Sequence, residues 1–190
     1  MEFTELPIKG AWLAESDLHS DNRGNFSEWF KKSEIASRTG FAFEAAQANI
    51  STSHKGVLRG IHYSLADVGQ AKWVTCVSGS VLDAIVDIRE GSPTYGKYEI
   101  INLEPKSGKS VLIGPGLGHG FIALEDSSSV AYLLSSKYSP ADEYEINPFD
   151  SEIRIEWGIE IAEAILSEKD KKAPSLETQK FNGKLPAYYS

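Results

Sequence analysis

The sequence is poor in the features that mark secreted and membrane proteins. It has one cysteine, Cys76, in 190 residues, which excludes an internal disulfide and indicates a reducing compartment. No apolar run is long enough to span a bilayer, and the N-terminus has no basic region followed by an apolar stretch. We therefore expect a cytoplasmic protein that does not bind a membrane.

Positive charge is also scarce. The chain has 19 Lys and Arg residues against 27 Asp and Glu residues, a formal net charge of -8, which argues against general binding to nucleic acid. A negatively charged ligand would need a local basic pocket that works against this overall field. The length, the hydrophobic fraction of 41% and the lack of an internal repeat or linker predict a single domain over residues 1–190.

The main pattern in the chain is a series of short strand-like segments. Turns with Gly, Ser or Pro separate them, which favours an antiparallel sandwich or barrel with a ligand site at its mouth. The expected strands are 25–30, 57–63, 71–77, 80–87, 98–103, 110–113, 120–124, 130–135 and 153–157. Short helices are expected at 31–39, at 159–166 and after Ser167. We place the barrel core at about residues 40–160 and a C-terminal helical segment and tail at about 160–190.

The segment Val57–Tyr63 carries two costly polar side chains, Arg59 and His62, among apolar and aromatic residues. Strict alternation would send them to opposite faces of a sheet. Gly60 is a position at which a β-bulge could bring them to the same side. From this segment alone, a functional pair and a satisfied core histidine beside a surface arginine are equally good interpretations.

Other polar residues have two readings as well. Three of them share one face of an extended segment, which is either solvated or lines a polar cavity: Gln47, Asn49 and Ser51. Tyr132 and Tyr138 have the same parity, so a continuous strand would point both phenols to one face. Lys72 either snorkels outward, the default for lysine, or points into the barrel. Asp170 is explained as the N3 acid of a capping box that begins at Ser167.

Two common site types are disfavoured. Residues 114–120 resemble a dinucleotide-binding loop only in their glycines and lack the strand–loop–helix context. His62 and His119 could bind a metal, but such a site normally needs three or more protein ligands. The sequence near His62 supplies no second His and no Glu. We therefore expect a site without metal.

Several motifs occur together, in order, over nearly the whole chain. They are Asp21-x-Arg23-Gly24-x-Phe26-x-Glu28, Gln47-x-Asn49-x-Ser51, Gly56-Val-Leu-Arg59-Gly-Ile-His62-Tyr63, Gln70-x-Lys72, Val86-Asp87-Ile88-Arg89-x-x-Ser92-Pro93-Thr94-x-Gly96, Gly118-His119-Gly120-Phe121 and Leu166-Ser167-x-x-Asp170-x-x-Ala173-Pro174. Together they closely resemble the dTDP-4-dehydrorhamnose 3,5-epimerase family of the nucleotide-sugar pathway to dTDP-L-rhamnose. The resemblance implies an all-β fold, a cupin-type jelly-roll barrel with short flanking helices.

The resemblance also implies an isomerase activity. The family inverts C3 and C5 of dTDP-4-dehydro-6-deoxy-D-glucose to give dTDP-4-dehydro-L-rhamnose, and both carbons lie next to the C4 ketone. Inversion needs a base on one face, an acid on the other and positive charge at the enolate oxygen. By resemblance, His62 is the base, Asp170 orients it, Tyr132 is the acid and Lys72 is the enolate-stabilising cation.

The same resemblance implies the binding residues and partners. Arg59 is similar to a diphosphate clamp, and Arg23 and Glu28 to residues that reach the nucleotide, in the family partly from a neighbouring subunit. The implied substrate-binding set is Arg23, Glu28, Gln47, Asn49, Ser51, Arg59, His119 and Tyr138. The family is homodimeric and uses no metal or organic cofactor.

The sequence departs from the family at two places. His19 stands where many members have a Phe that packs on the nucleotide base, and Gly114 precedes Pro115 where many members have Pro directly after Ile113. Three alternatives stay open: an epimerase for C3 or C5 alone, a sugar-binding cupin without catalysis, and a metal-dependent cupin oxygenase. The sugar-binding cupin does not account for an aligned base, acid and cation, and the missing metal ligands disfavour the oxygenase.

Overall fold

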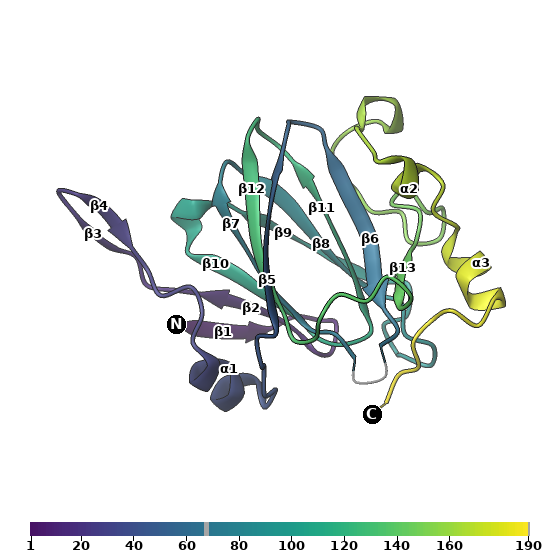
Figure 1. Cartoon of the computed structure of the whole chain (residues 1–190), viewed down its shortest axis with the longest axis horizontal. Coiled ribbons are helices and arrows are strands. Elements are labelled where there is room, and N and C mark those ends of the chain that lie inside the picture. Colours follow the sequence, from purple (N-terminus) through teal and green to yellow (C-terminus); the bar gives the residue numbers. More distant parts are fainter. Residues whose placement is uncertain (67–68, 190) are drawn as a thin grey trace.

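Two antiparallel sheets pack face to face, as the all-β jelly-roll prediction requires (Figure 1). The computed structural model describes residues 1–66 and 69–189. The larger sheet contains, in spatial order, β1 (Glu2–Glu5), β2 (Ala11–Glu15), β10 (Lys109–Ile113), β7 (Lys72–Ser78), β12 (Ser128–Leu134) and β5 (Gln47–Ser53). The smaller sheet contains β13 (Glu143–Glu145), β6 (Leu58–Ser64), β11 (Leu117–Ala123), β8 (Val81–Asp87) and β9 (Tyr98–Leu103).

Short elements flank this sandwich. The strands β3 (His19–Asp21) and β4 (Gly24–Phe26) form a separate hairpin that projects away from the two sheets, at the left of Figure 1. The helices are α1 (Lys32–Thr39), α2 (Glu168–Lys171) and α3 (Leu176–Phe181), with 3₁₀ turns at Pro105–Ser107 and Ile161–Glu163. Helices α2 and α3 lie on the side of the smaller sheet near β6 and β13.

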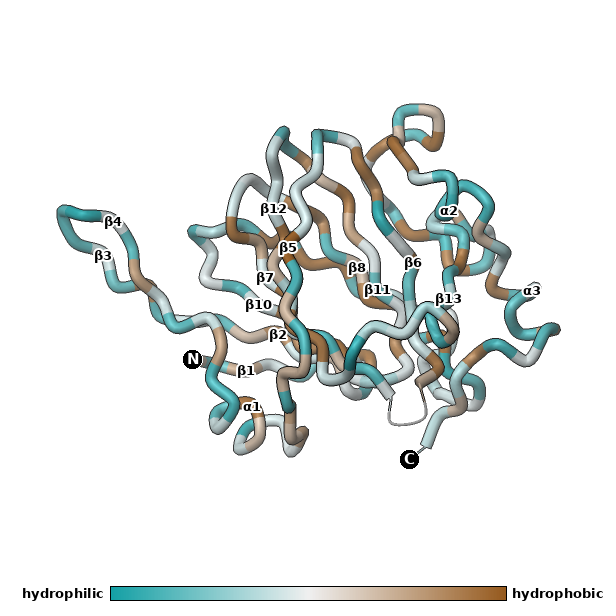
Figure 2. The backbone as a smooth tube through the Cα atoms, viewed as in Figure 1, coloured by the Kyte–Doolittle hydropathy of each residue, from teal (hydrophilic) through white to brown (hydrophobic). Residues whose placement is uncertain are grey.

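The alternation of the strands explains how the core forms. Apolar side chains from both sheets, such as Val74, Ile85 and Val111, meet between the sheets and are excluded from water. Figure 2 shows hydrophobic residues concentrated along the central strands, whereas the tip of the β3–β4 hairpin is hydrophilic. Strand β5 differs from the central strands because its inward positions, Asn49 and Ser51 among them, are polar and half-buried.

Several expected elements were wrong or incomplete. The strand expected at 25–30 ends at Phe26, and the helix expected at 159–166 is only the 3₁₀ turn Ile161–Glu163. Residues 153–157 form no strand, because Asp150 accepts hydrogen bonds from the backbone of Glu152 and Ile153 and holds the chain in a turn. Tyr138 lies beyond the end of β12, so the continuous strand on which the shared-parity argument depends is not formed.

Four elements were not anticipated. Strands β1 and β2 extend the larger sheet, although the core was expected to begin near residue 40; their side chains lack the clean apolar alternation of a buried strand. Strand β13 is three residues long, too short for a periodic signal. Helix α3 forms in the expected tail, and Ser175 caps its N-terminus by accepting a hydrogen bond from Thr178 N–H.

The expected bulge in β6 is present. The register of β11 against β6 passes from the pair His119–His62 to the pair Phe121–Arg59. Two steps along β11 therefore match three steps along β6, which is the definition of a bulge. The extra residue lets Arg59 and His62 face the same cavity. Gly60 permits the close approach, since a β-carbon there would lie 2.5 Å from the Gly120 α-carbon.

Replacing Gly60 by alanine should destabilise the fold strongly. The backbone has a φ of +127° there and no room for a side chain. Gly91 is a matched control, because its φ is also positive at +86° but nothing lies within 4 Å of the added β-carbon. In urea unfolding, the free energy of unfolding should fall by about 1–3 kcal/mol more in Gly60→Ala than in Gly91→Ala. Equal losses in the two variants would contradict the packing argument.

Candidate active site

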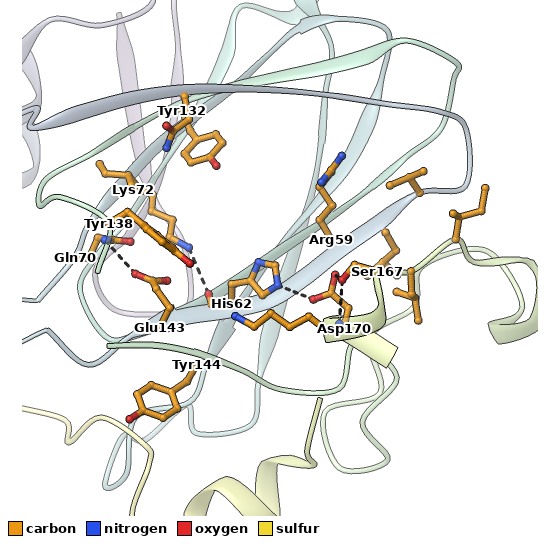
Figure 3. Close-up of a pocket in the computed structure, with 17 residues that line it drawn as sticks. Arg59, His62, Gln70, Lys72, Tyr132, Tyr138, Glu143, Tyr144, Ser167 and Asp170 are labelled. Carbon is orange, nitrogen blue, oxygen red and sulfur yellow. Dashed lines mark hydrogen bonds and ion pairs between the residues drawn. The ribbon is translucent and has the colours of Figure 1, made fainter. Parts of the chain in front are cut away.

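A cavity of about 510 Å³ opens between the two sheets beside α2 (Figure 3). Residues from β5, β6, β7, β12, β13 and α2 line it, so both sheets and the C-terminal segment contribute side chains. The four predicted catalytic residues all reach this cavity: His62, Lys72, Tyr132 and Asp170. Their side chains come from sequence positions up to 108 residues apart.

His62 and Asp170 form a hydrogen-bonded pair. The distance from His62 Nε2 to Asp170 Oδ1 is 2.6 Å. An ionised carboxylate can only accept a hydrogen bond, so Nε2 carries a proton and the lone pair of the neutral ring is on Nδ1. Nδ1 is therefore the atom of this ring that can accept a proton from a ligand. The pair holds the imidazole in the form that a general base requires.

The charge of Asp170 is maintained against its burial. Burial raises the pKa of Asp170, but the hydrogen bond and charge of His62 and the hydroxyl of Ser167 lower it by more, and the net pKa lies below its ordinary value. The side chain is only 4% exposed. Asp170 is thus an anion, fixed beside the imidazole, that stabilises a positive charge on it.

Tyr132 lies across the cavity from His62. Its strand, β12, belongs to the larger sheet, whereas His62 belongs to the smaller one, and Figure 3 shows the phenol and the imidazole on opposite sides of the opening. Burial raises the pKa of Tyr132 above its ordinary value, and the Asn49 hydrogen bond and the Arg59 charge offset only part of this. The phenol therefore holds a proton at neutral pH and can donate it.

Lys72 points into the cavity, so the snorkelling alternative was wrong. The residue is 8% exposed, and its Nζ donates to the His62 carbonyl oxygen at 3.4 Å. Burial lowers the pKa of Lys72 below its ordinary value, and the charges of Glu143 and Asp83 partly restore it. The amine lines the same cavity as His62 and Tyr132, so one bound molecule can meet all three side chains (Figure 3).

The cavity is locally basic, as an anionic ligand would require in a chain of net charge -8. Arg59, Lys72 and Lys169 line it, against the acidic side chains of Glu143 and Asp170. Arg59 donates from Nε to Ser53 Oγ at 3.1 Å, and its side chain lines the cavity beside His62. A guanidinium presented in this way suits a diphosphate.

A smaller cavity of about 160 Å³ shares four of these side chains and adds Ser51, His119 and Phe121. His119 is 8% exposed and pairs with buried Asp83, at 2.7 Å between Nε2 and Oδ2. Two of the expected binding residues, Ser51 and His119, therefore lie in this inner extension of the main site. Asn49, Arg59 and Tyr138 lie in the main cavity.

Three expected binding residues do not line either cavity. Gln47 stands behind Asn49, to which it donates at 3.0 Å, and its side-chain oxygen accepts from the Tyr138 backbone N–H. Arg23 belongs to the projecting hairpin, with its side chain 85% exposed and bonded to Asp21. Glu28 follows this hairpin and pairs with Lys31.

Sequence reasoning missed several cavity residues, including Ser167, Lys169 and Glu143. Ser167 was recognised only as a helix cap, Lys169 sits inside the same capping box without a role, and Glu143 had no sequence signal because β13 was not anticipated. Within residues 1–66 and 69–189, no group of three or more His, Cys, Asp or Glu is placed to hold a metal ion. No helix in this described part is both long and apolar enough to cross a membrane.

Comparison with known proteins assigns the chain to a protein family. Residues 5–178 match the family model of dTDP-4-dehydrorhamnose 3,5-epimerase. The chain belongs to this family. It is 45% identical over 188 residues to a dTDP-4-dehydrorhamnose 3,5-epimerase of Mycolicibacterium smegmatis, covering 99% of this chain and 92% of the relative. The relatives of this epimerase-family chain act on dTDP sugars.

Solved structures agree with this assignment and with the jelly-roll fold. The rmlC epimerase of Mycobacterium tuberculosis superposes with a TM-score of 0.95 at 41% identity, covering 99% of this chain and 94% of the other. ChmJ from Streptomyces bikiniensis, a 3′-monoepimerase solved with dTDP-quinovose, gives a TM-score of 0.92 at 44% identity, covering 96% and 92%. Family members of similar identity thus carry names for one and for two inverted centres.

The His62–Asp170 pair should make folding stability depend on acid pH. Because the folded-state pKa of Asp170 lies below the ordinary 3.8, its contribution is complete above that value and is lost as the pH falls through the folded-state value. At neutral pH, urea unfolding should give Asp170→Asn a free energy of unfolding about 1–3 kcal/mol below that of the wild type. This difference from the wild type should shrink below about pH 4.

Glu168→Gln is the control for this measurement, because Glu168 is an exposed acid on the same short helix. Its free energy of unfolding should differ little from that of the wild type at every pH. A difference for Asp170→Asn that stays constant from about pH 6 to pH 3 would contradict the assigned charge state.

Proposed function

We propose that the protein inverts C3 and C5 of dTDP-4-dehydro-6-deoxy-D-glucose to form dTDP-4-dehydro-L-rhamnose. The observation that carries this proposal is the placement of His62 and Tyr132 on opposite sheets, across one cavity that Lys72 also lines. An inversion needs proton removal on one face of the sugar and proton return on the other. A site with base and acid on the same side would not provide this.

The proposed chemistry follows from the C4 ketone. His62 Nδ1 takes the proton from the carbon next to the ketone, and the electron pair of that C–H bond moves to the ketone oxygen to form an enolate. Lys72 stabilises the negative oxygen, and the imidazolium is stabilised by Asp170. Tyr132 then gives its proton to the opposite face of the same carbon. Proton transfer through solvent restores both groups for the next turn.

Recognition of the nucleotide is assigned to the basic side chains and the mouth of the cavity. Arg59 suits the diphosphate, and Asn49, Ser51 and His119 offer polar atoms to the sugar and diphosphate. Tyr138 is 53% exposed at the mouth and is available to pack against a ring of the ligand. No metal or organic cofactor takes part in this proposal.

A single-centre epimerase is the second candidate. The specific observation that favours it is the 44% identity to ChmJ, which is named a 3′-monoepimerase, against 45% to a 3,5-epimerase. The same base, acid and cation would serve one centre or two. The two candidates differ only in how many protons the enzyme exchanges.

Proton NMR of dTDP-4-keto-6-deoxyglucose in deuterated water separates these candidates. Loss of both the C3 and C5 proton signals is the expected result, since each proton removed by His62 is replaced from solvent. Loss of the C3 signal or the C5 signal alone would establish the single-centre epimerase. If neither signal is lost while the sugar binds, the protein is a sugar-binding cupin without catalysis or acts on a different keto sugar.

Two variants test the roles of base and acid. His62→Ala should abolish exchange of both protons, with nucleotide binding nearly intact by calorimetry. Tyr132→Phe should retain proton removal but form inverted product about 10²–10⁴-fold more slowly, because the returning acid is absent. Unchanged turnover in either variant would remove that residue from its role.

We also propose that the active protein is a homodimer in which the β3–β4 hairpin reaches the partner's cavity. The hairpin projects from its own subunit, its Phe26 is 64% exposed, and neither Arg23 nor Glu28 lines the cavity of its own chain. Exposed aromatic and charged residues on a projecting arm fit a contact with another molecule. The nucleotide end of each site would then be completed by the other chain.

Mixing two inactive variants tests the shared site. A His62→Ala chain and an Arg23→Ala chain each damage every site of their own homodimer. A mixed dimer contains one site with both residues intact, so random exchange should restore about a quarter of wild-type activity. Activity no higher than the average of the two separate variants would contradict a contribution of the hairpin to the partner's site.

A further inference from the structure

Each oxygen of the Asp170 carboxylate has its own partner. Oδ1 accepts from His62 Nε2 at 2.6 Å, and Oδ2 accepts from Ser167 Oγ at 2.9 Å. The side chain is almost entirely removed from water. Because bulk water offers little replacement, these two hydrogen bonds decide how the carboxylate is turned. Figure 3 shows both bonds on the cavity side of α2.

The hydroxyl proton of Ser167 has a defined direction. Ser167 Oγ accepts from the Asp170 backbone N–H at 3.1 Å, as an N-cap residue does. Its own proton must then go to Oδ2, since the carboxylate can only accept. In an ordinary capping box the acid would bond back to the N-cap backbone N–H. Here the carboxylate is turned instead toward the hydroxyl and the His62 ring.

Backbone hydrogen bonds fix the position of α2 independently of this hydroxyl. Ahead of the helix, Ile165 exchanges hydrogen bonds with the start of β6, from Leu58 N–H to the Ile165 oxygen at 3.0 Å and from Ile165 N–H to the Gly56 oxygen at 2.9 Å. After the helix, the Pro174 oxygen accepts from Asn147 N–H at 2.8 Å. The helix is therefore held at both ends, and the hydroxyl controls the rotation of one side chain.

We propose that Ser167 is a positioning residue of this site: its hydroxyl holds the Asp170 carboxylate in the rotation that meets His62 Nε2 and so keeps Nδ1 directed at the substrate. The role assumes the base function of His62 given under Proposed function. Without the hydroxyl, Oδ2 is buried without its donor and the anion is less stable. The His62–Asp170 pair then takes up a proton at higher pH, and the base is lost at higher pH.

Other titratable or charged groups lie on the elements around this pair, and Ser167 variants leave them unchanged. They are Arg59 on β6, Lys72 on β7, His119 on β11, Tyr132 on β12, Tyr138 after β12, Glu143, Tyr144 and Glu145 on β13, and Glu168, Lys169 and Lys171 on α2. A shift in the proton uptake of the pair on removal of one neutral hydroxyl is thus attributable to that hydroxyl.

Four variants separate positioning from helix capping. Ser167→Ala removes the hydroxyl and the cap, Ser167→Gly removes the hydroxyl but keeps a residue that is tolerated at N-caps, and Ser167→Thr keeps both. Ser175→Ala is the matched control, because Ser175 caps α3 in the same way and does not line the cavity. It reports the effect of a lost cap in this segment.

The readout is the pH profile of kcat/KM on dTDP-4-keto-6-deoxyglucose. We expect the acid limb to move up by about one pH unit in Ser167→Ala and Ser167→Gly. It should stay at the wild-type position in Ser167→Thr and Ser175→Ala, although Ser175→Ala lowers the melting temperature about as much as Ser167→Ala. Acid limbs that coincide in all variants, or a full rescue by glycine, would overturn the proposal.

A second readout needs no turnover. NMR of the histidine rings in the ligand-free protein follows proton uptake by the His62–Asp170 pair directly, with His62→Asn used to assign the signal. The same upward shift in Ser167→Ala and Ser167→Gly supports positioning, and its absence refutes it. If the wild type does not act on the keto sugar, the proposed function fails, but this measurement still decides the role of Ser167.

Discussion

The hydrogen bond from His62 to Asp170 is the constraint on which the site depends, because it joins a strand of the barrel to a short helix 108 residues later in the chain. Separate features of the fold position the His62 ring and the Asp170 carboxylate. The bulge at Gly60 turns His62 to the same cavity as Arg59, and backbone bonds between Ile165 and the start of β6 bring α2 to that strand. The bond then fixes the ring and places the proton on Nε2. Everything proposed about catalysis uses the lone pair left on Nδ1.

The two-sheet architecture positions the other two side chains of the proposed chemistry, Lys72 and Tyr132. Antiparallel strands place alternate side chains inside, and at one end of this sandwich the inward positions are polar instead of apolar. Buried polar groups are costly unless they are paired, and most of those at the site are paired with one another or with the backbone. Because burying an unpaired polar group is costly, Lys72 and Tyr132 lie beside a cavity that a ligand can fill and not within the apolar core.

The sequence predicted the strands well where alternation and turn residues agree. Tyr98–Leu103 was found at the expected bounds, and the bulge at Gly60 followed from one glycine between two polar residues. The short strand β13 could not be predicted, because three residues carry no period. The family resemblance, not periodicity, connected Asp170 with His62. Local pattern rules cannot show which distant segments pack together.

The central claim is that base and acid approach one sugar ring from opposite faces. The most direct measurement is a crystal structure of Tyr132→Phe bound to dTDP-4-keto-6-deoxyglucose. The account predicts the ketone oxygen at Lys72 Nζ, C3 or C5 within about 3.5 Å of His62 Nδ1, and the ring of the substituted residue 132 against the other face of the sugar. A sugar bound with both side chains on one face, or with Nε2 directed at it, would contradict the account.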